Sequence, residues 1–281
     1  SSDLGPTEKS GQAATSTKNL PKLTRMLFSI LEGSGLNTLS DDYPFDYLKS
    51  IFRYSRTLPM WKNSPMVLAD VLSTITLPGH LFSLCKRLKV ENRFAEHNKR
   101  PQGYAIGIAQ NFTENSIILP CGYEIKVVGA ISAPNRVPKG PYWFMILVGA
   151  RSAESRFFEN LRATIWPAYS EKLPIPVDSD PERYTLKELI SWTLYWQSKG
   201  DAYTVMKPLD FTTNVRPDFI VQDCESGNRV VIETMGSNDG AYLTRKKEMH
   251  ELMSRYGHVI EHRIGDDSLA FKKSVTTAIM S

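Results

Sequence analysis

The sequence predicts an α/β (α+β) protein in which a helical and antiparallel-β N-terminal region precedes a C-terminal mixed sheet flanked by helices. Two observations support this prediction. Between residues 183 and 264, apolar side chains follow a helical period, then three strand-like runs, a second helical period and a further strand. Earlier in the chain, helical spacing up to residue 100 gives way to a period of two between residues 103 and 151.

Length and composition fit a globular protein with no membrane anchor. The chain has 281 residues, 41% hydrophobic and 23% charged, which is enough for one large or two ordinary domains. Its longest apolar run, residues 142–150, is far below the ~20 residues of a membrane span, and the N-terminus has no signal-peptide pattern. Three widely spaced cysteines fit neither a disulfide framework nor a zinc ribbon. We therefore expect an intracellular, cytoplasmic protein in a reducing compartment.

The N-terminal part is expected to be an arm followed by helices and then strands. Residues 1–22 are rich in Ser, Thr, Gly, Ala and Lys without an apolar period, which is typical of a disordered arm. Helical spacing predicts helices at residues 24–31, 47–54, 65–75, 80–96 and 153–166. Alternation predicts strands of a small antiparallel sheet at residues 104–112, 116–119, 123–131 and 142–151.

A proline-rich stretch, residues 167–181, is the best linker in the chain. It predicts one domain over residues 23–166 and another over residues 182–281. The charge divides at the same place, because residues 1–176 hold 21 Lys and Arg against 14 Asp and Glu, and residues 177–281 hold 13 against 16. A basic part beside an acidic part would suit phosphate binding by the first and metal binding by the second. The alternative is that the surplus has no partner, because many domains that do not bind nucleic acid carry as much positive charge.

The helix expected at residues 80–96 carries positive charge between its apolar residues. Lys86, Arg87, Lys89 and Arg93 are the residues expected to contact DNA phosphates. The alternative for such a run is a solvated helix face with no partner.

In the C-terminal part, the expected helices and strands follow one another with short connections. A helix is expected at residues 183–197, with Thr185 as its N-cap, followed by a strand at residues 203–211. Two further strands, residues 217–223 and 229–235, flank turn residues 224–227. A helix that follows residues 236–240 and a strand at residues 258–264 complete the series.

Two carboxylates are expected to meet at one end of these strands. If residues 224–227 form a four-residue loop, Asp218 lies opposite Glu233, and both side chains point the same way. Like charges at that distance repel each other, so a hard divalent cation between them, such as Mg²⁺, would explain the pair. The alternative for Glu233 is a strand-end carboxylate in a salt bridge with Arg216 or Arg229.

The next helix places a lysine near this pair. Its apolar stripe consists of Tyr242, Met249, Met253 and Tyr256, which we expect in the core, and Lys246 lies on the stripe. Lys247 is turned well away. Lys246 can therefore reach back to the carboxylates, or alternatively pack its stem and extend its amine to solvent.

These residues resemble the PD-(D/E)XK, or restriction-endonuclease-like, nuclease superfamily. Pro217 and Asp218 match its PD, and residues 233–235 match its (D/E)XK except that Met235 stands where the lysine is usual. Some members carry that lysine on the next helix, where Lys246 lies. Glu188 matches the further acidic residue that many members carry on the first helix. The resemblance covers about the last 105 residues, including the order helix, three strands, helix, strand.

The resemblance implies a metal-dependent endonuclease that hydrolyses DNA, as found among restriction, repair, recombination and mobile-element proteins. Asp218 and Glu233 would hold Mg²⁺ (or Mn²⁺), with the Thr234 carbonyl completing the site, and Lys246 would orient the attacking water or stabilise phosphoryl charge. The alternative is a catalytically inactive nuclease-like domain that binds DNA or anchors a partner in a larger assembly, which Met235 favours. A third interpretation, a protein–protein adaptor, would require acidic residues capped by arginines and a buried basic helix.

Overall fold

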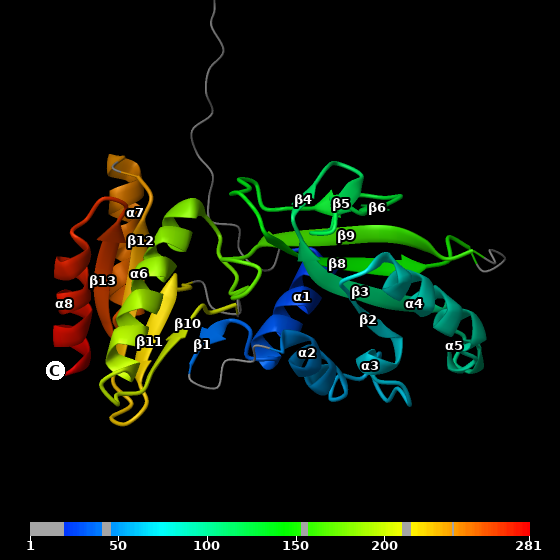
Figure 1. The fold of residues 1–281 in the computed structure, drawn as a ribbon, viewed down its shortest axis with the longest axis horizontal. Coiled ribbons are helices and arrows are strands. Elements are labelled where there is room, and N and C mark those ends of the chain that lie inside the picture. Colours follow the sequence, from blue (N-terminus) through cyan, green and yellow to red (C-terminus); the bar gives the residue numbers. More distant parts are fainter. Residues whose placement is uncertain (1–19, 41–45, 153–156, 210–214, 238) are drawn as a thin grey trace, which may run out of the picture.

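The computed structural model describes residues 20–40, 46–152, 157–209, 215–237 and 239–281, and the side chains of all of these except 241 and 245. Most of the expected N-terminal arm therefore lies outside the described residues. The described chain forms a mixed α+β structure with three sheets (Figure 1). None of its helices is long and apolar enough to cross a membrane, and its three cysteines are free.

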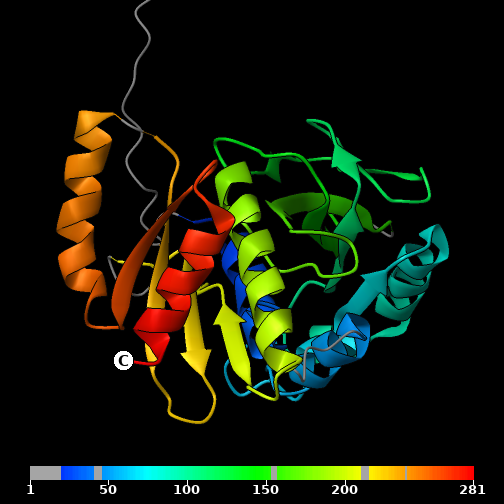
Figure 2. The same cartoon turned by 60° about the vertical axis from the view of Figure 1, so that its left-hand side comes forward.

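The C-terminal sheet has five strands in the order β1-β10-β11-β12-β13. These are β1 (Thr38–Leu39), β10 (Tyr203–Met206), β11 (Phe219–Asp223), β12 (Arg229–Met235) and β13 (His258–Arg263). Only β12 and β13 are parallel among these neighbours. Helices α6 (Asp180–Gln197) and α8 (Ser268–Ile279) lie on one face of this sheet and α7 (Gly240–Met253) on the other (Figure 2). The predicted order of helix, three strands, helix and strand is confirmed.

The pairing of β11 with β12 has the register expected from the sequence. Phe219 is opposite Ile232, and Val221 is opposite Val230. The Asp223 amide donates to the Asn228 carbonyl at 3.0 Å, so the four-residue loop is confirmed as well. Every residue of β12 after Arg229 is buried, as its almost continuous apolar run indicated.

Helix α6 begins earlier than expected. Its N-cap is Ser179, whose hydroxyl accepts from the Glu182 amide at 3.2 Å, whereas the expected N-cap Thr185 is a buried residue inside the helix. The reason is that Pro181 suits the first helical turn and the capping hydroxyl precedes it.

The N-terminal helices agree with the sequence in part. The structure contains α1 (Lys22–Gly33), α2 (Tyr47–Ser55), α3 (Leu68–Val71), α4 (Pro78–Val90) and α5 (Arg93–Glu96). The helix expected at residues 65–75 is wrong except for the single turn of α3, because β2 (Leu72–Ile75) pairs with a neighbouring strand instead. The helix expected at residues 80–96 is broken between α4 and α5, where the Glu91 carboxylate accepts from the Arg93 amide.

The expected small antiparallel sheet is two sheets. A five-stranded sheet has the order β2-β3-β8-β9-β7, with β2 and β7 each parallel to their neighbour, and β4, β5 and β6 form a separate antiparallel sheet. The strands are β3 (Gln102–Ala109), β4 (Asn111–Phe112), β5 (Ser116–Ile118), β6 (Glu124–Lys126), β7 (Ile131–Ser132), β8 (Tyr142–Gly149) and β9 (Glu159–Pro167).

Strand β9 replaces the helix expected at residues 153–166, of which residues 153–156 are not described. It lies between β8 and β7, and its last five residues are buried. A strand covered on both faces has no polar alternation, so its spacing resembles that of a short buried helix.

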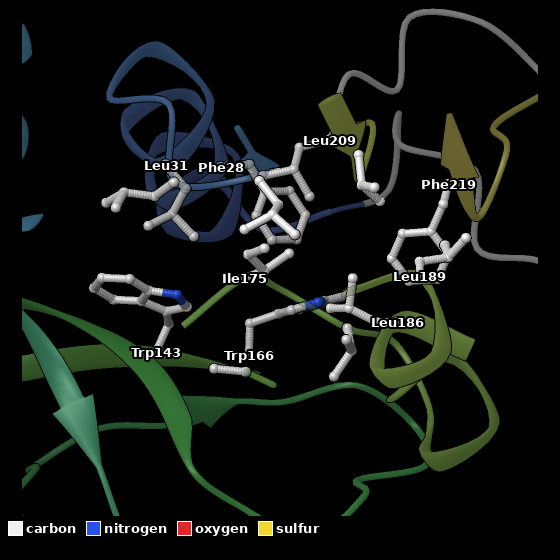
Figure 3. Packing of buried hydrophobic residues seen from close by; sticks show 14 of the residues in the cluster. Phe28, Leu31, Trp143, Trp166, Ile175, Leu186, Leu189, Leu209 and Phe219 are labelled. Carbon is white, nitrogen blue, oxygen red and sulfur yellow. The ribbon is translucent and has the colours of Figure 1, made fainter. Parts of the chain in front are cut away.

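One apolar core joins the two halves of the chain. Figure 3 shows Phe28 and Leu31 of α1, Trp143 and Trp166 of the N-terminal sheet, and Leu186 and Phe219 of the C-terminal half in one cluster. The expected linker is folded into it, because Ile175 and Val177 are fully buried and the Val177 amide donates to the Pro167 carbonyl at 3.0 Å. Residues 167–181 therefore connect the halves as packed structure and not as an open linker.

Candidate active site

The Asp218 and Glu233 carboxylates each accept from a backbone amide across the β11–β12 pair. The Asp218 amide donates to Glu233 Oε1 at 3.1 Å, and the Thr234 amide donates to Asp218 Oδ2 at 2.8 Å. Asp218 directly precedes β11, whose ladder with β12 ends at the pair of Phe219 and Ile232. Beyond that pair, backbone amides of β12 on the β11 side can therefore donate to side chains, as the Thr234 amide does to Asp218. The two carboxylates lie together at this end of the sheet, as the register predicted.

Lys246 reaches this pair from α7. Its Nζ forms an ion pair with Glu233 Oε2 and lies 3.6 Å from Asp218 Oδ2. Its side chain is only 17% exposed, so the amine does not extend to solvent. The expected approach of this amine to Glu233 is confirmed. The alternative partners of Glu233 are wrong, because Arg216 pairs with Asp178 and Arg229 donates to Gln222.

The other residues on the stripe of α7 do not all lie in the core. Met253 is buried and Met249 packs beside it against Val231. Tyr256 is a correction, since it lies beyond the end of α7 and is 36% exposed. Met235, at the position of the missing lysine, is buried.

Burial and neighbouring charges shift the pKa values of Glu233 and Lys246. Burial and the neighbouring Asp218 carboxylate raise the pKa of Glu233 to about 7, although Lys246 opposes this. Burial disfavours the charged Lys246 amine, but the carboxylates of Asp218 and Glu233 outweigh it and raise the pKa of that lysine. The buried Glu233 carboxylate and the half-buried Asp218 carboxylate therefore share one ammonium group, and a further cation would favour the ionised form of Glu233.

The oxygen atoms at the site fit a hard divalent cation. They are the Asp218 and Glu233 carboxylates and the Thr234 carbonyl, which accepts from the Tyr242 hydroxyl at 3.3 Å. Mg²⁺ commonly binds through one or two carboxylates and keeps several waters. Asp218 and Glu233 would be the charged ligands of such a cation. Among the described residues, no group of three or more His, Cys, Asp or Glu side chains has metal-binding spacing.

Glu188 lies away from these carboxylates. It accepts from Ser268 and forms a 3.1 Å ion pair with Lys272, both in α8. Another acidic side chain of α6 is Glu182, whose pKa is raised by burial and by the charges of Asp178 and Asp218. Glu188 lies six positions after Glu182, so the two are about 120° apart around the helix and about 9 Å apart along it. The contacts of Glu188 are thus with α8 and not with the carboxylate pair.

Glu182 belongs to a buried ionic cluster that sequence reasoning missed. Lys207 Nζ lies 2.6 Å from Glu182 and 3.0 Å from Asp178, and Arg216 also binds Asp178. Lys207 is fully buried. Arg216 and Lys207 outweigh burial and lower the pKa of Asp178, whereas burial and Asp178 raise the pKa of Glu182 to about 8. The one available signal was a lysine between the apolar residues of the strand expected at residues 203–211; in the structure Lys207 directly follows β10.

The four cations expected at a DNA interface have different environments. Arg87 donates to the Leu72 carbonyl at 2.7 Å, and Arg93 binds Glu91 and Asp70, so both are engaged within the fold. Lys86 and Lys89 are exposed, with Lys86 over the Phe82 ring. Helix α4, which carries three of the four, lies at the opposite end of the molecule from α7 (Figure 1).

Comparisons with known protein families cover both halves of the chain. Residues 2–168, more than half of the chain, match a family described as a domain of unknown function (DUF8535). The chain belongs to that family. In this DUF8535 protein, residues 178–279 match the restriction endonuclease-like C-terminal domain, in agreement with the resemblance of the C-terminal part alone.

A relative and the solved structures complete the comparison. This DUF8535 protein is 35% identical over 134 residues to an Escherichia coli protein described as "Uncharacterized protein in cib 5'region". The match covers 42% of this chain and 60% of the relative, so this chain spans less than two thirds of that relative's length. No solved structure matches.

Proposed function

We propose that the restriction endonuclease-like domain is a metal-dependent endonuclease that hydrolyses DNA phosphodiester bonds. The observation that supports this most is the convergence of Asp218, Glu233 and Lys246 at one end of the sheet. Two acidic oxygen ligands and an amine at one point are the groups that metal-assisted phosphodiester hydrolysis needs.

Each residue has a distinct role in this proposal. Asp218, Glu233 and the Thr234 carbonyl hold Mg²⁺ or Mn²⁺. When bound, the cation would supply charge stabilisation at the phosphate and acidify a bound water. Lys246 would orient the attacking water or stabilise the negative charge that develops on the phosphoryl oxygens. Glu233 serves as a ligand in its ionised form, to which Lys246 contributes by opposing the effect of burial.

A second candidate function is a nuclease-like domain without catalysis that binds DNA or an assembly partner. The observation that favours it is Met235, a buried apolar side chain at the position of the usual lysine. This candidate differs from the first in a measurable way, because it retains binding and lacks divalent-dependent cleavage.

The test is cleavage of plasmid and single-stranded DNA by the whole chain with Mg²⁺, Mn²⁺ or EDTA. We expect divalent-dependent cleavage that Asp218→Asn reduces by about 10²-fold or more, comparable to the loss of one catalytic group. Asp223→Asn is the matched control, since Asp223 lies at the other end of β11 and accepts from Ser226 in the turn. DNA binding without cleavage in the unsubstituted protein would support the second candidate instead.

A further inference from the structure

A chain of buried hydrogen bonds lies behind the candidate metal site, on the opposite face of the sheet from α7. The Thr234 hydroxyl donates to the Thr185 hydroxyl at 3.0 Å, and the Thr185 hydroxyl lies 2.8 Å from His262 Nδ1. Thr185 and His262 are fully buried. The three residues come from α6, β12 and β13, so the chain joins three elements at one level of the sheet, where Thr234 and His262 are aligned in register.

The bond between Thr185 and His262 can form in either neutral tautomer of the imidazole. A hydroxyl has one proton and two acceptor positions, so Thr185 can accept from Thr234 and either donate to His262 Nδ1 or accept from it. His262 Nε2 is buried and has no hydrogen-bond partner among the described residues. Nδ1 is therefore the ring nitrogen through which His262 is joined to Thr185.

The histidine ring itself has little freedom. It is stacked on Tyr184 with ring centroids 5.6 Å apart and on Phe271 with centroids 3.9 Å apart. A ring packed against two aromatic rings keeps Nδ1 at a fixed place, and Thr185 is held in turn by the helix around it. This arrangement is more rigid than two hydroxyl groups that rotate independently.

The other end of the chain is the metal site. Thr234 donates its amide to Asp218 Oδ2 at 2.8 Å, and its carbonyl faces the Tyr242 hydroxyl. The ladder between β11 and β12 has already ended at Ile232, so Thr234 is flanked by a paired strand only on the side of β13, whose ladder with β12 continues to Met235. Asp218 binds the amide of Thr234, and the Thr185 hydroxyl binds its side chain, so Thr185 holds this residue through a second group.

We propose that Thr185, supported by His262, is a positioning residue that fixes the end of β12 so that Asp218, Glu233 and the Thr234 carbonyl converge on one cation. The part of this inference that concerns the cation rests on the proposed function. Hydrogen-bonded groups behind metal ligands commonly change metal affinity by about 10–100-fold when they are removed.

The test compares Thr185→Val, which removes the hydroxyl at similar volume, with Thr193→Val. Thr193 is a matched control, because it is a buried threonine two turns later in α6 whose hydroxyl donates to the Leu189 carbonyl. We expect Thr185→Val to weaken Mn²⁺ binding by about tenfold in calorimetry and to accelerate hydrogen exchange of the Thr234 amide. Thr185→Ser should restore both, and Thr193→Val should change neither.

Amide exchange separates this inference from the proposed function, because it is measured without metal. If the unsubstituted protein does not bind Mn²⁺, the proposed function fails, and exchange of the Thr234 amide still tests Thr185. If Thr185→Val does not fold, Thr234→Val removes the same bond from the other side and should accelerate the same exchange. Exchange rates unchanged from the unsubstituted protein in a folded Thr185→Val or Thr234→Val variant would overturn the inference.

Discussion

Lys246 is the residue whose surroundings depart most from those of an ordinary helical lysine. Its amine lies between two carboxylates that would otherwise repel each other in a buried site. We expect Lys246→Ala to reduce cleavage by about 10²-fold or more, as for loss of a group that stabilises phosphoryl charge, with Mn²⁺ binding retained. Single-turnover cleavage and calorimetry measure the two effects separately. Lys247→Ala is the control, since Lys247 is exposed one position later.

A double substitution tests whether the position of the amine matters or only its presence. Met235→Lys combined with Lys246→Ala should recover part of the cleavage lost in Lys246→Ala, provided that both positions deliver an amine to the same phosphate. Full activity in Lys246→Ala alone would contradict a role for this lysine and would leave Met235→Lys without anything to rescue.

The raised pKa of Glu233 predicts a pH dependence of metal binding. Below about 7 this carboxyl holds a proton that competes with the cation, so the Mn²⁺ affinity should rise about tenfold per unit up to that pH and then level off. Asp218→Asn removes the like charge and should lower the pKa of Glu233. A Mn²⁺ affinity that does not change between pH 5.5 and 8 in the unsubstituted protein would exclude Glu233 as the titrating ligand.

In the metal-free protein, protonation of two buried glutamates should make the unfolding free energy change with pH in the direction opposite to the Mn²⁺ affinity. The folded protein keeps protons on Glu182 and Glu233 to higher pH than the unfolded chain does, because burial raises both pKa values. Their contribution to the unfolding free energy should therefore fall as pH rises from about 4.5 to 8, whereas His250 and His262, whose pKa values burial lowers, oppose this fall below about 6.5. Mn²⁺ should reduce this fall by stabilising ionised Glu233. Denaturant unfolding at several pH values measures the trend.

At the scale of single elements, the proposal that α4 and α5 bind DNA can be tested. Lys86 and Lys89 are exposed, whereas Arg87 and Arg93 bind Leu72, Glu91 and Asp70 within the fold. If α4 binds phosphates, the double change of Lys86 and Lys89 to Glu should weaken DNA binding and reduce the salt slope by about 0.9 for each phosphate that the helix no longer neutralises. Salt titrations of affinity measure this. An unchanged slope would assign the helix to solvent.

The elements also show why some structure is predictable from sequence and some is not. The register of β11 with β12 follows from a loop of known length, so the meeting of Asp218 with Glu233 could be derived from local information. Strand β9 could not, because its partners lie elsewhere in the chain and its burial on both faces removes the alternation that identifies a strand.

The same reason explains which site residues escaped prediction. Thr185, Glu182 and Lys207 acquire their roles from contacts across the sheet with Thr234, Asp178 and His262. None of these roles follows from a local sequence pattern. Lys246 was predictable because one helical stripe, read from the residues themselves, placed it toward the strand it follows.

At the scale of the whole molecule, hydrogen bonds and core contacts join the two halves of the chain across residue 178, where the match to the C-terminal domain begins. Trp166 donates to Asp178 at 3.0 Å, and the side chain and carbonyl of Asn37 bind the Lys207 carbonyl and amide at 2.9 and 2.8 Å. Residues from both halves also form one core cluster. The halves should therefore depend on each other for folding.

Removing the N-terminal half tests this dependence. A fragment of residues 178–281 lacks β1 and exposes apolar side chains of the shared core, so we expect aggregation or a broad thermal transition at lower temperature. A fragment of residues 20–281 retains the contacts described above and should unfold like the whole chain. Circular dichroism melts and size-exclusion chromatography compare the two. A monodisperse 178–281 fragment with the melting temperature of the whole chain would show that the C-terminal half is autonomous.

Strand β1 is only two residues long, yet it occupies one edge of the C-terminal sheet beside β10. The other edge, β13, has exposed charged and polar side chains, and its last amide, that of Arg263, donates to Asp266 at 2.7 Å. Unpaired edges invite hydrogen bonding with foreign strands, and short strands or charges discourage it. By pairing with β10, Thr38 and Leu39 leave less of that edge open to hydrogen bonds with a strand of another molecule. A relative that kept only the C-terminal half would need another way to close that edge.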